Sequence, residues 1–308
     1  MSSHYASAYA AALSAASQAA SGQNYPPGSL YVVATPIGNL ADITLRALHV
    51  LQLADTIACE DTRHTQTLLR AYGIDKTSAQ LLAVHQHNES EAAQTVIDRL
   101  NQGQRVAYAS DAGTPAISDP GARLVSAVRR AHLPVVPLPG ASSVTTALSV
   151  AGITDDGAQQ GAFVFVGFLS SKATERANAI QTLSFEARAI VLLEAPHRIE
   201  ALAGALAVLG DRQITIGREL TKQFEEIATV KASDFPGWMG AESNRSRGEF
   251  VLVLHPAVVA VESGAELRVL KLLLAELPLK TAVKLAADIT GASRNVLYEA
   301  ALGLKKEE

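Results

Sequence analysis

The fold is decided by the stretch Ser110-Asp111-Ala112-Gly113-Thr114-Pro115-Ala116-Ile117-Ser118-Asp119-Pro120-Gly121. It follows an apolar run, 105–109, that is typical of a buried strand, and it precedes a helical pattern over 122–131. Open α/β sheets bind ligands where the carboxyl end of a strand opens into such a loop. Its glycines allow close backbone approach, and its prolines stiffen the chain. The stretch therefore predicts a ligand site, although Asp119 and Pro120 also suit a helix cap followed by proline at the first helical position.

Length and composition narrow the class of protein. A chain of 308 residues suits two domains with a small third piece, and 48% hydrophobic residues support a large core. The 26 basic and 30 acidic residues give a net charge of -4, which argues against nucleic-acid binding through bulk charge. Any RNA contact must then come from a local patch. Cys59 is the only cysteine, which excludes an internal disulfide and fits a cytoplasmic protein, and no apolar run approaches the length that spans a bilayer.

Short apolar runs alternate with helical patterns from Leu30 onward, which predicts two α/β domains. We expect the first domain over 29–154, with a largely parallel sheet. Its strands are predicted at 30–34, 56–60, 81–85, 105–109 and 135–138. A second domain is expected over 155–256. Its strands are predicted at 163–168, 189–193, 213–217 and 250–254.

The two ends of the chain differ in style from these domains. Residues 1–28 are rich in Ala and Ser and contain no Lys or Arg, so we expect a disordered tail rather than a secretory signal. The segment 257–308 contains Pro278 and two short helical patterns around Gly291, which resemble a helix-turn-helix. An appendage used only for packing or dimerisation is an equal alternative for this segment.

Several common sites are absent from the sequence. No Gly-x-Gly-x-x-Gly follows the first predicted strand and no Gly-x-x-x-x-Gly-Lys-Ser/Thr occurs, which disfavours a dinucleotide-dependent dehydrogenase and a P-loop enzyme. Ser142 and Ser143 lack the frame of a nucleophile elbow. The eight histidines show no ligand spacing, so we expect no catalytic metal.

What remains is a set of polar clusters at predicted strand ends. They are Thr35-Pro36-Ile37-Gly38-Asn39-Leu40, Glu60-Asp61-Thr62-Arg63, the stretch 110–121, Pro139-Gly140-Ala141-Ser142-Ser143, Glu194-Ala195-Pro196-His197-Arg198, Arg218-Glu219-Leu220-Thr221-Lys222 and Arg247-Gly248-Glu249. Together these motifs resemble the tetrapyrrole-methylase superfamily, and within it the bacterial enzymes that methylate small-subunit ribosomal RNA. The resemblance runs from about Leu30 to the end of the chain.

The resemblance implies an α/β fold with a cofactor cleft between two α/β domains, plus a small C-terminal helical appendage. It implies transfer of a methyl group from S-adenosylmethionine to the ribose 2'-hydroxyl of a cytidine in the decoding region of 16S rRNA, by a homodimer. The residues it implies for cofactor binding are Pro36, Asp111, Ala112, Gly113, Thr114, Ser142, Ser143, Phe168 and Leu169. A carboxylate is needed for the amino group of the cofactor, and Asp111 is the first choice.

Transfer to a hydroxyl also needs a group that takes up its proton. The sequence does not single out one base: Glu60, Asp61 and Lys222 rank ahead of His87 and Glu89, and Lys222 needs a depressed pKa for this role. Other polar residues of the strand-end clusters, and three that follow the predicted strand 81–85, are expected to contact the RNA substrate, with ion pairing inside the protein as the alternative for each cation. These are Arg63, His87, Asn88, Glu89, His197, Arg198, Arg218 and Arg247.

Two other functions stay open at this stage. One is C-methylation of a tetrapyrrole of the precorrin type, since those enzymes share the two-domain core. The other is a non-catalytic nucleic-acid-binding protein that uses the terminal helix-turn-helix, in which Arg294 and Asn295 would lie. The second alternative leaves the strand-end clusters unexplained.

Overall fold

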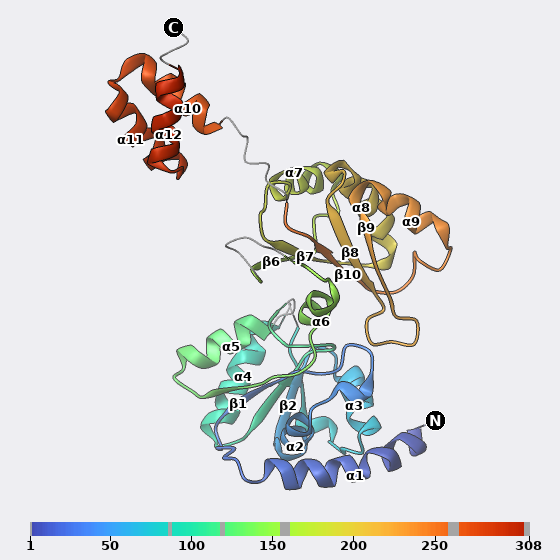
Figure 1. Cartoon of the computed structure of the whole chain (residues 1–308). Coiled ribbons are helices and arrows are strands. Elements are labelled where there is room, and N and C mark those ends of the chain that lie inside the picture. The colour runs from blue at the N-terminus through green and yellow to red at the C-terminus, as the bar shows by residue number, and fades with distance from the viewer. Residues whose placement is uncertain (1, 86–87, 118–120, 155–160, 258–264, 305–308) are drawn as a thin grey trace. The chain divides into compact units, whose positions relative to one another are not determined.

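The computed structural model of the chain describes residues 2–85, 88–117, 121–154, 161–257 and 265–304 (Figure 1). The chain divides into two compact units, Met1–Pro256 and Ala257–Glu308. His87, Asp119 and Pro120, which the sequence places in the candidate site, lie outside the described residues.

The first sheet of the large unit is entirely parallel, as its sequence predicts. Its strands are β1 (Leu30–Val33), β2 (Thr56–Cys59), β3 (Leu81–Ala83), β4 (Val106–Ala109) and β5 (Val135–Leu138). Their order is β3-β2-β4-β1-β5, so the central strand β4 lies between β2 and β1. The carboxyl ends of all these strands therefore meet at one edge of the sheet.

Helices cover both faces of this sheet because successive residues of a strand point to opposite sides. Val106 and Tyr108 of β4 pack with α4 (Glu89–Asn101) and α5 (Gly121–Arg130). Ala107 and Ala109 join the opposite core, beneath α2 (Leu45–Leu53) and α3 (Thr62–Ala71). Thr44 caps α2, since its hydroxyl accepts the N–H of Ala47 at 3.1 Å.

The expectation of a disordered N-terminal tail is wrong. Residues Ser2–Ala20 form helix α1, and Ala16 and Ala20 are buried in the core under α2 and α3. Tyr9 meets Tyr72 of α3 edge-on, with ring centroids 4.9 Å apart. Alanine is the best helix former, and its small side chain lets α1 lie close to its neighbours. The Ala-rich composition therefore builds a packed helix here.

The second sheet is mixed, with order β6-β7-β10-β8-β9. Its strands are β6 (Phe163–Gly167), β7 (Ala189–Glu194), β8 (Gln213–Arg218), β9 (Glu226–Lys231) and β10 (Phe250–Leu254). Only β6 and β7 run parallel, and the other pairs are antiparallel. One face packs against α7 (Ala173–Leu183), α8 (Ile199–Leu206) and α9 (Phe235–Ala241). The sequence analysis missed β9 and α9.

The opposite face of the second sheet is covered by α6 (Ser143–Val150). Val144, Ala147 and Ala151 pack against Val191 of β7 and Val253 of β10. Helix α6 follows β5 in the chain, yet its packing is with the second sheet. It therefore joins the two α/β halves into one compact unit (Figure 1).

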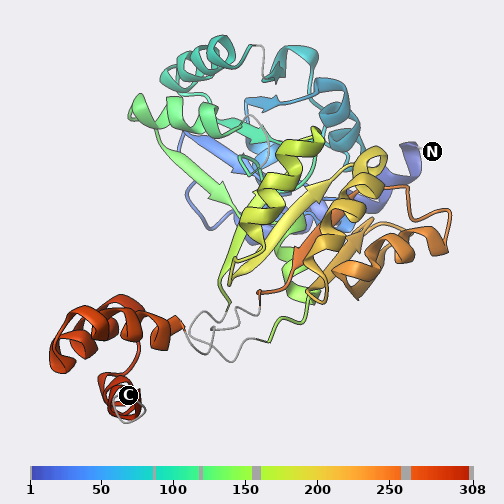
Figure 2. The same cartoon turned by 90° about the horizontal axis from the view of Figure 1, so that it is seen from above.

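The described residues of the small unit form a cluster of three helices, α10 (Ala265–Glu276), α11 (Leu279–Thr290) and α12 (Arg294–Leu304), shown in Figure 2. Pro278 caps the start of α11, and Gly291 ends it with a φ of 73°, the left-handed conformation that glycine adopts most readily. The turn around Gly291 is as predicted, and α10 adds a third helix. Short 3-10 segments complete the chain at Leu40–Asp42, Ser78–Gln80, Pro196–Arg198, Ala207–Leu209 and Ala232–Asp234. Within the described part of the chain, no helix combines the length and apolar character of a membrane span.

The packing of α1 predicts different effects for two neighbouring substitutions. Ala16→Arg places a long charged side chain where the structure has a fully buried alanine, so we expect it to lower the free energy of unfolding by about 1–3 kcal/mol. Ala15→Arg, on the exposed side of the same helix, should change it by less than about 0.5 kcal/mol. Urea denaturation measures both, and equal values for the two variants would contradict the docking of α1.

Candidate active site

The loops that follow β1 and β4 are joined by backbone hydrogen bonds. The N–H of Thr35 donates to the carbonyl of Gly113 at 2.9 Å, and the N–H of Gly113 donates back to the carbonyl of Thr35 at 3.0 Å. The Ser110 hydroxyl donates to the Gly113 carbonyl at 3.0 Å. Gly113 has a φ of +82°, the left-handed region that favours glycine, and a Cβ there would make a tight contact of 3.2 Å with the side chain of Ile37.

The loop between β5 and α6 joins the same assembly. The Thr114 hydroxyl donates to the carbonyl of Ala141 at 2.9 Å. A Cβ on Gly140 would lie only 2.8 Å from the Cβ of Ala34, so the loop after β5 lies directly on the end of β1. Ala116 adopts a φ of +68°, a conformation that is uncommon outside glycine and often found at functional sites. The loops after β1, β4 and β5 therefore form one connected wall.

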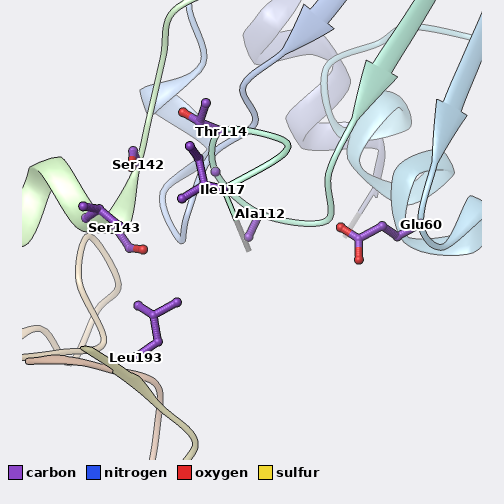
Figure 3. Close-up of a pocket in the computed structure, with 9 residues that line it drawn as sticks. Glu60, Ala112, Thr114, Ile117, Ser142, Ser143 and Leu193 are labelled. Carbon is purple, nitrogen blue, oxygen red and sulfur yellow. The ribbon is translucent and has the colours of Figure 1, made fainter. Parts of the chain in front are cut away.

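Two cavities open along this wall. The first, of about 180 Å³, is the one drawn in Figure 3. It is lined by Glu60, Ala112, Gly113, Thr114, Ile117, Ser142, Ser143, Val144 and Leu193. The second, of about 270 Å³, is more apolar. It is lined by Ile37, Ala112, Ser143, Phe168, Leu193, Glu194, Ala195, Pro196, Leu220, Glu249, Phe250 and Val251. Both cavities are thus lined by residues of both sheets, and they share Ala112, Ser143 and Leu193.

Acidic side chains tie the ends of β2 and β4 together. A carboxylate oxygen of Glu60 accepts the N–H of Asp111 at 3.3 Å, and a carboxylate oxygen of Asp111 accepts the N–H of Asp61 at 3.4 Å. Glu60 lines the first cavity, whereas Asp111 lines neither. The neighbouring Cys59 is buried, and burial raises the pKa of its thiol to about 11, so it stays protonated and is no nucleophile.

The side chain of Asp61 is used to cap helix α3 and to pair with Arg63. It accepts the N–H of Arg63 at 2.8 Å as the cap of α3, and its carboxylate pairs with the Arg63 guanidinium at 2.7 Å. Hydrogen bonds from the side chain and backbone of Arg63 hold the pKa of Asp61 far below its ordinary value. Asp61 is therefore a carboxylate that accepts a proton only with difficulty. The Arg63 side chain remains 90% exposed.

Lys222 lies between two carboxylates, 2.8 Å from Glu219 and 2.9 Å from Glu249. Burial opposes its charge, but the hydrogen bonds to these carboxylates outweigh that effect, and the pKa of Lys222 is raised above its ordinary value. The condition that the sequence analysis set for Lys222 as a base, a depressed pKa, is therefore not met. Lys222 lies in a turn over residues 219–222, and two residues of this turn, Glu219 and Thr221, have positive φ values of 50° and 65°.

The Lys222 turn also touches the loop after β1. The N–H of Asn39 donates to the Thr221 hydroxyl at 3.1 Å. A Cβ on Gly38 would lie 2.5 Å from Cγ of Lys222 and 3.0 Å from the carbonyl oxygen of Leu220. Gly38 is thus the residue that lets loops from the two sheets approach each other.

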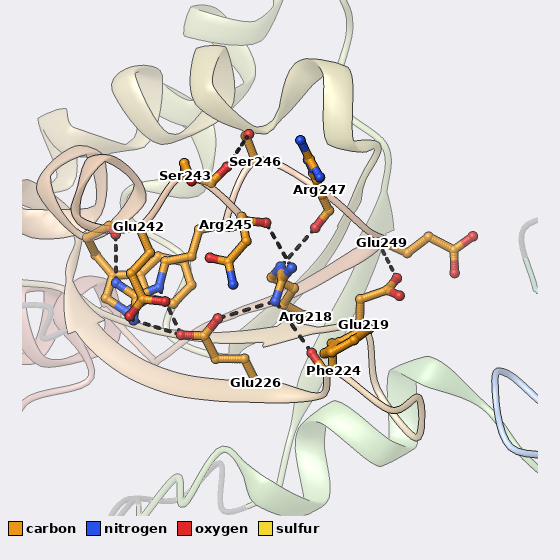
Figure 4. Close-up of polar contacts among 12 residues, drawn as sticks. Arg218, Glu219, Phe224, Glu226, Glu242, Ser243, Arg245, Ser246, Arg247 and Glu249 are labelled. Atoms are coloured by element: carbon orange, nitrogen blue, oxygen red, sulfur yellow. Dashed lines mark hydrogen bonds and ion pairs between the residues drawn. The ribbon is translucent and has the colours of Figure 1, made fainter.

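Arg218 lies inside a polar network and is only 5% exposed (Figure 4). Its guanidinium donates to the carbonyls of Arg247 and Asn244, each at 2.8 Å, and pairs with Glu226 at 3.4 Å. Glu226 in turn pairs with Arg245, whose guanidinium stacks on Trp238 at 4.1 Å. The network holds the loop that carries Arg247. Because the guanidinium of Arg218 is buried and bonded within it, this group is not accessible to an external phosphate.

Arg198 is also used internally. It pairs with Glu194 at 3.0 Å and donates to the carbonyl of Leu169, which is itself buried in the core of the second domain. Asn88 bonds the backbone of His85 and Ala83, and the side chain of Glu89, 6% exposed, pairs with Arg123 at 3.0 Å.

The structure thus brings only part of the predicted site together. Ala112, Gly113, Thr114, Ser142, Ser143, Phe168 and Glu60 line the cavities, whereas Pro36, Asp111 and Leu169 are not among the lining residues. Among the predicted substrate residues, Arg63, His197 and Arg247 are exposed. Sequence analysis missed Ile37, Leu193, Glu194, Leu220 and Glu249 as lining residues, although most of them stand inside the quoted motifs. Among the described residues, no group of three His, Cys, Asp or Glu is placed to hold a metal ion.

The lining suits a nucleoside joined to a charged amino acid. The larger cavity presents apolar side chains, which suit an aromatic base, and the smaller one presents Glu60, hydroxyl groups and loop backbone, which suit a cationic group and its polar ends. Together they reach the size of small-molecule pockets, about 300–1,000 Å³. The residues present therefore fit S-adenosylmethionine.

The fold and this cavity define a two-domain methyltransferase, and comparisons with known proteins agree. The uroporphyrin-III C-methyltransferase of Thermus thermophilus has a similar fold, with a TM-score of 0.52 and 22% identity over 75% of this chain and 96% of that one. Residues 29–236 match the family described as Tetrapyrrole (Corrin/Porphyrin) Methylases, and residues 260–305 match the RsmI C-terminal HTH domain.

Two curated relatives cover nearly the whole chain. A protein of Escherichia coli O157:H7 named Ribosomal RNA small subunit methyltransferase I is 46% identical over 89% of this chain and 95% of its own length. The protein of the same name in Neisseria meningitidis serogroup B is 47% identical over 91% of this chain and 95% of its own length. This chain therefore belongs to the tetrapyrrole methylase family and, within it, to the group that carries that name. It is a methyltransferase that uses S-adenosylmethionine, the methyl donor of this family.

The contact at Gly38 predicts a loss of cofactor affinity on substitution. Gly38→Ala forces the loop after β1 away from the Leu220–Lys222 turn, so we expect binding of S-adenosylhomocysteine to weaken about tenfold or more. Gly204→Ala is the control, because a Cβ there meets no atom within 4 Å. Calorimetric titration measures both, and unchanged affinity in Gly38→Ala would show that this contact does not shape the cavity.

Proposed function

We propose that the protein methylates the 2'-hydroxyl of a cytidine ribose in the decoding region of 16S rRNA within the small ribosomal subunit. The observation that carries the proposal is the extended match to relatives named for small-subunit ribosomal RNA, which includes the C-terminal helical unit as well as the cofactor domains. We propose further that it acts as a homodimer in the cytoplasm, where ribosomal subunits are found.

S-adenosylmethionine, when bound, supplies an electrophilic methyl group, so the chain must align the hydroxyl and receive its proton. Glu60 is the carboxylate that lines the first cavity, and its backbone is fixed at the end of β2. Asp61 is held ionised by Arg63, and Lys222 is held protonated by Glu219 and Glu249. We therefore assign proton uptake to Glu60 and electrostatic or positioning roles to Asp61 and Lys222.

A local basic surface is needed because the net charge of the chain is -4. Arg63, with 90% of its side chain exposed, follows Glu60 closely in the chain, and Arg247 is exposed on the loop that the Arg218 network supports. We propose these two arginines, with His197, as contacts to RNA phosphates or riboses. Arg198 and Arg218 are not retained for this role, since their guanidinium groups are largely buried against the protein's own carbonyls and carboxylates, whereas the pair of Arg63 with Asp61 is exposed.

Two isosteric substitutions separate the proposed roles of the neighbouring carboxylates. Glu60→Gln keeps an oxygen for the N–H of Asp111 but removes the proton acceptor, so we expect kcat to fall by about 100-fold or more with cofactor affinity within a few fold. Asp61→Asn retains a helix cap and should keep most of kcat. Single-turnover methylation measures both. A larger loss in Asp61→Asn than in Glu60→Gln would reverse the assignment.

The proposed function is tested by transfer of a labelled methyl group to small ribosomal subunits that lack their native modifications. Mass mapping of the product should place the label on a cytidine ribose. Label on a base would contradict the proposed acceptor atom. Cofactor binding without any label on RNA would move the substrate to a small molecule such as a tetrapyrrole, the substrate class named for the relatives with the same fold.

A further inference from the structure

Glu194 is a buried acidic residue for which the proposed reaction has no role so far. It is the last residue of β7, and its side chain is only 1% exposed. It lines the larger cavity, whose walls are otherwise mainly apolar. A carboxylate in such surroundings requires partners for both of its oxygens.

The contacts of Glu194 satisfy one oxygen only. Oε1 accepts the N–H of Ala195 at 2.9 Å and lies 3.0 Å from Nε of Arg198. Among the described residues, Oε2 is buried and has no hydrogen-bond partner, and Nε of Arg198, which lies against Oε1, has none either. Buried polar atoms are almost always paired, so an unpaired carboxylate oxygen beside a ligand cavity calls for a donor from outside the chain.

The surrounding residues cannot supply that donor in their present arrangement. Arg198, the nearest cation, is held in place by its bond to the carbonyl of Leu169. The lining of the larger cavity contains no Lys or Arg. Its walls also include the hydroxyl of Ser143, which makes no hydrogen bond to Oε2, and the side chains of Phe168, Leu220 and Phe250, which have no hydrogen to donate to an oxygen. The donor therefore belongs to the ligand.

We propose that Glu194 accepts a hydrogen bond from the exocyclic amino group of the adenine of S-adenosylmethionine. This inference rests on the cofactor of the proposed function. Adenine matches the cavity because it has two apolar faces and one edge that donates hydrogen bonds. A cytidine of the RNA also carries an amino group, but it is flanked by phosphates on both sides, and a cavity of about 270 Å³ with an apolar lining and no cation is unsuited to them.

Glu194 distinguishes adenine from related bases because its carboxylate accepts hydrogen bonds and donates none. A carboxylate oxygen only accepts, so a 6-amino group satisfies it, whereas the 6-oxo group of hypoxanthine would place a second acceptor against it. The Arg198 pair acts as a positioning contact, because it fixes the rotamer of Glu194 through Oε1 and leaves Oε2 for the ligand.

The test compares S-adenosylhomocysteine with S-inosylhomocysteine, in which an oxo group replaces the 6-amino group and the adjacent N1 carries a hydrogen, by calorimetric titration of the full-length protein. The unmodified protein should prefer the adenosyl compound by about tenfold or more. In Glu194→Gln the amide can donate to the oxo group, so the preference should shrink to about threefold or less, or reverse. Arg198→Lys, which keeps a cation beside Glu194, should weaken both ligands alike and preserve their ratio.

Thermal denaturation verifies that each variant is folded. Glu194→Asp is a second variant, whose carboxylate is one methylene further from the cavity. It should also reduce the preference for the adenosyl over the inosyl compound. An unchanged ratio in folded Glu194→Gln and Glu194→Asp would overturn the proposal. A loss confined to the KM for RNA would overturn it in favour of substrate recognition. The proposed function fails separately, if the unmodified protein binds S-adenosylhomocysteine but leaves ribosomal RNA unlabelled.

Discussion

The reciprocal backbone hydrogen bonds between Thr35 and Gly113 are the constraint on which the site depends. Parallel strands bring their carboxyl ends to one edge of a sheet, but they do not decide how the loops beyond that edge are arranged. Here the loops after β1 and β4 form a single wall, and Thr114 extends it to the loop before α6. The positive φ of Gly113 and the close contact at Gly140 disfavour any larger residue at these two positions. The cavity is therefore shaped by backbone atoms, which move little, rather than by flexible side chains.

Charged residues around this wall fall into distinct roles that depend on their partners. Asp61 stays ionised and Lys222 stays protonated because each is paired with a neighbour of opposite charge. The guanidinium of Arg218 donates its hydrogen bonds to carbonyl groups of the loop that it supports. Exposed cations such as Arg63 remain able to meet a polyanion. In a chain with a net negative charge, the position of such exposed cations beside the cavity matters more for RNA contact than the total number of basic residues.

Much of this arrangement follows from the sequence, because buried parallel strands are written as continuous apolar runs and their ends as clusters of Gly, Pro and Asp. The strand β9 escaped notice because Ile227 faces outward while Ala228 and Val230 face inward, so its apolar pattern does not match its burial. Helix α1 was mistaken for a tail because a segment rich in Ala and Ser can form either a packed helix or a linker, and composition does not distinguish them. The commitment of Arg198 and Arg218 to internal partners depends on long-range contacts, which one-dimensional spacing does not contain. For the same reason, the missing partner of Glu194 is visible only in three dimensions.

Helix α6 has a consequence for how fast ligands are exchanged. Its first turn lines both cavities, while its apolar side packs against β7 and β10 of the second sheet. A wide separation of the two halves would break either the hydrogen bond between Thr114 and the loop before α6 or the packing of α6 against the second sheet. We therefore expect the spent cofactor to leave by a local rearrangement of lining side chains such as the half-exposed Phe168, rather than by a wide separation of the two halves. Turnover would accordingly be paced by small local motions, and its temperature dependence would reflect them rather than domain rotation.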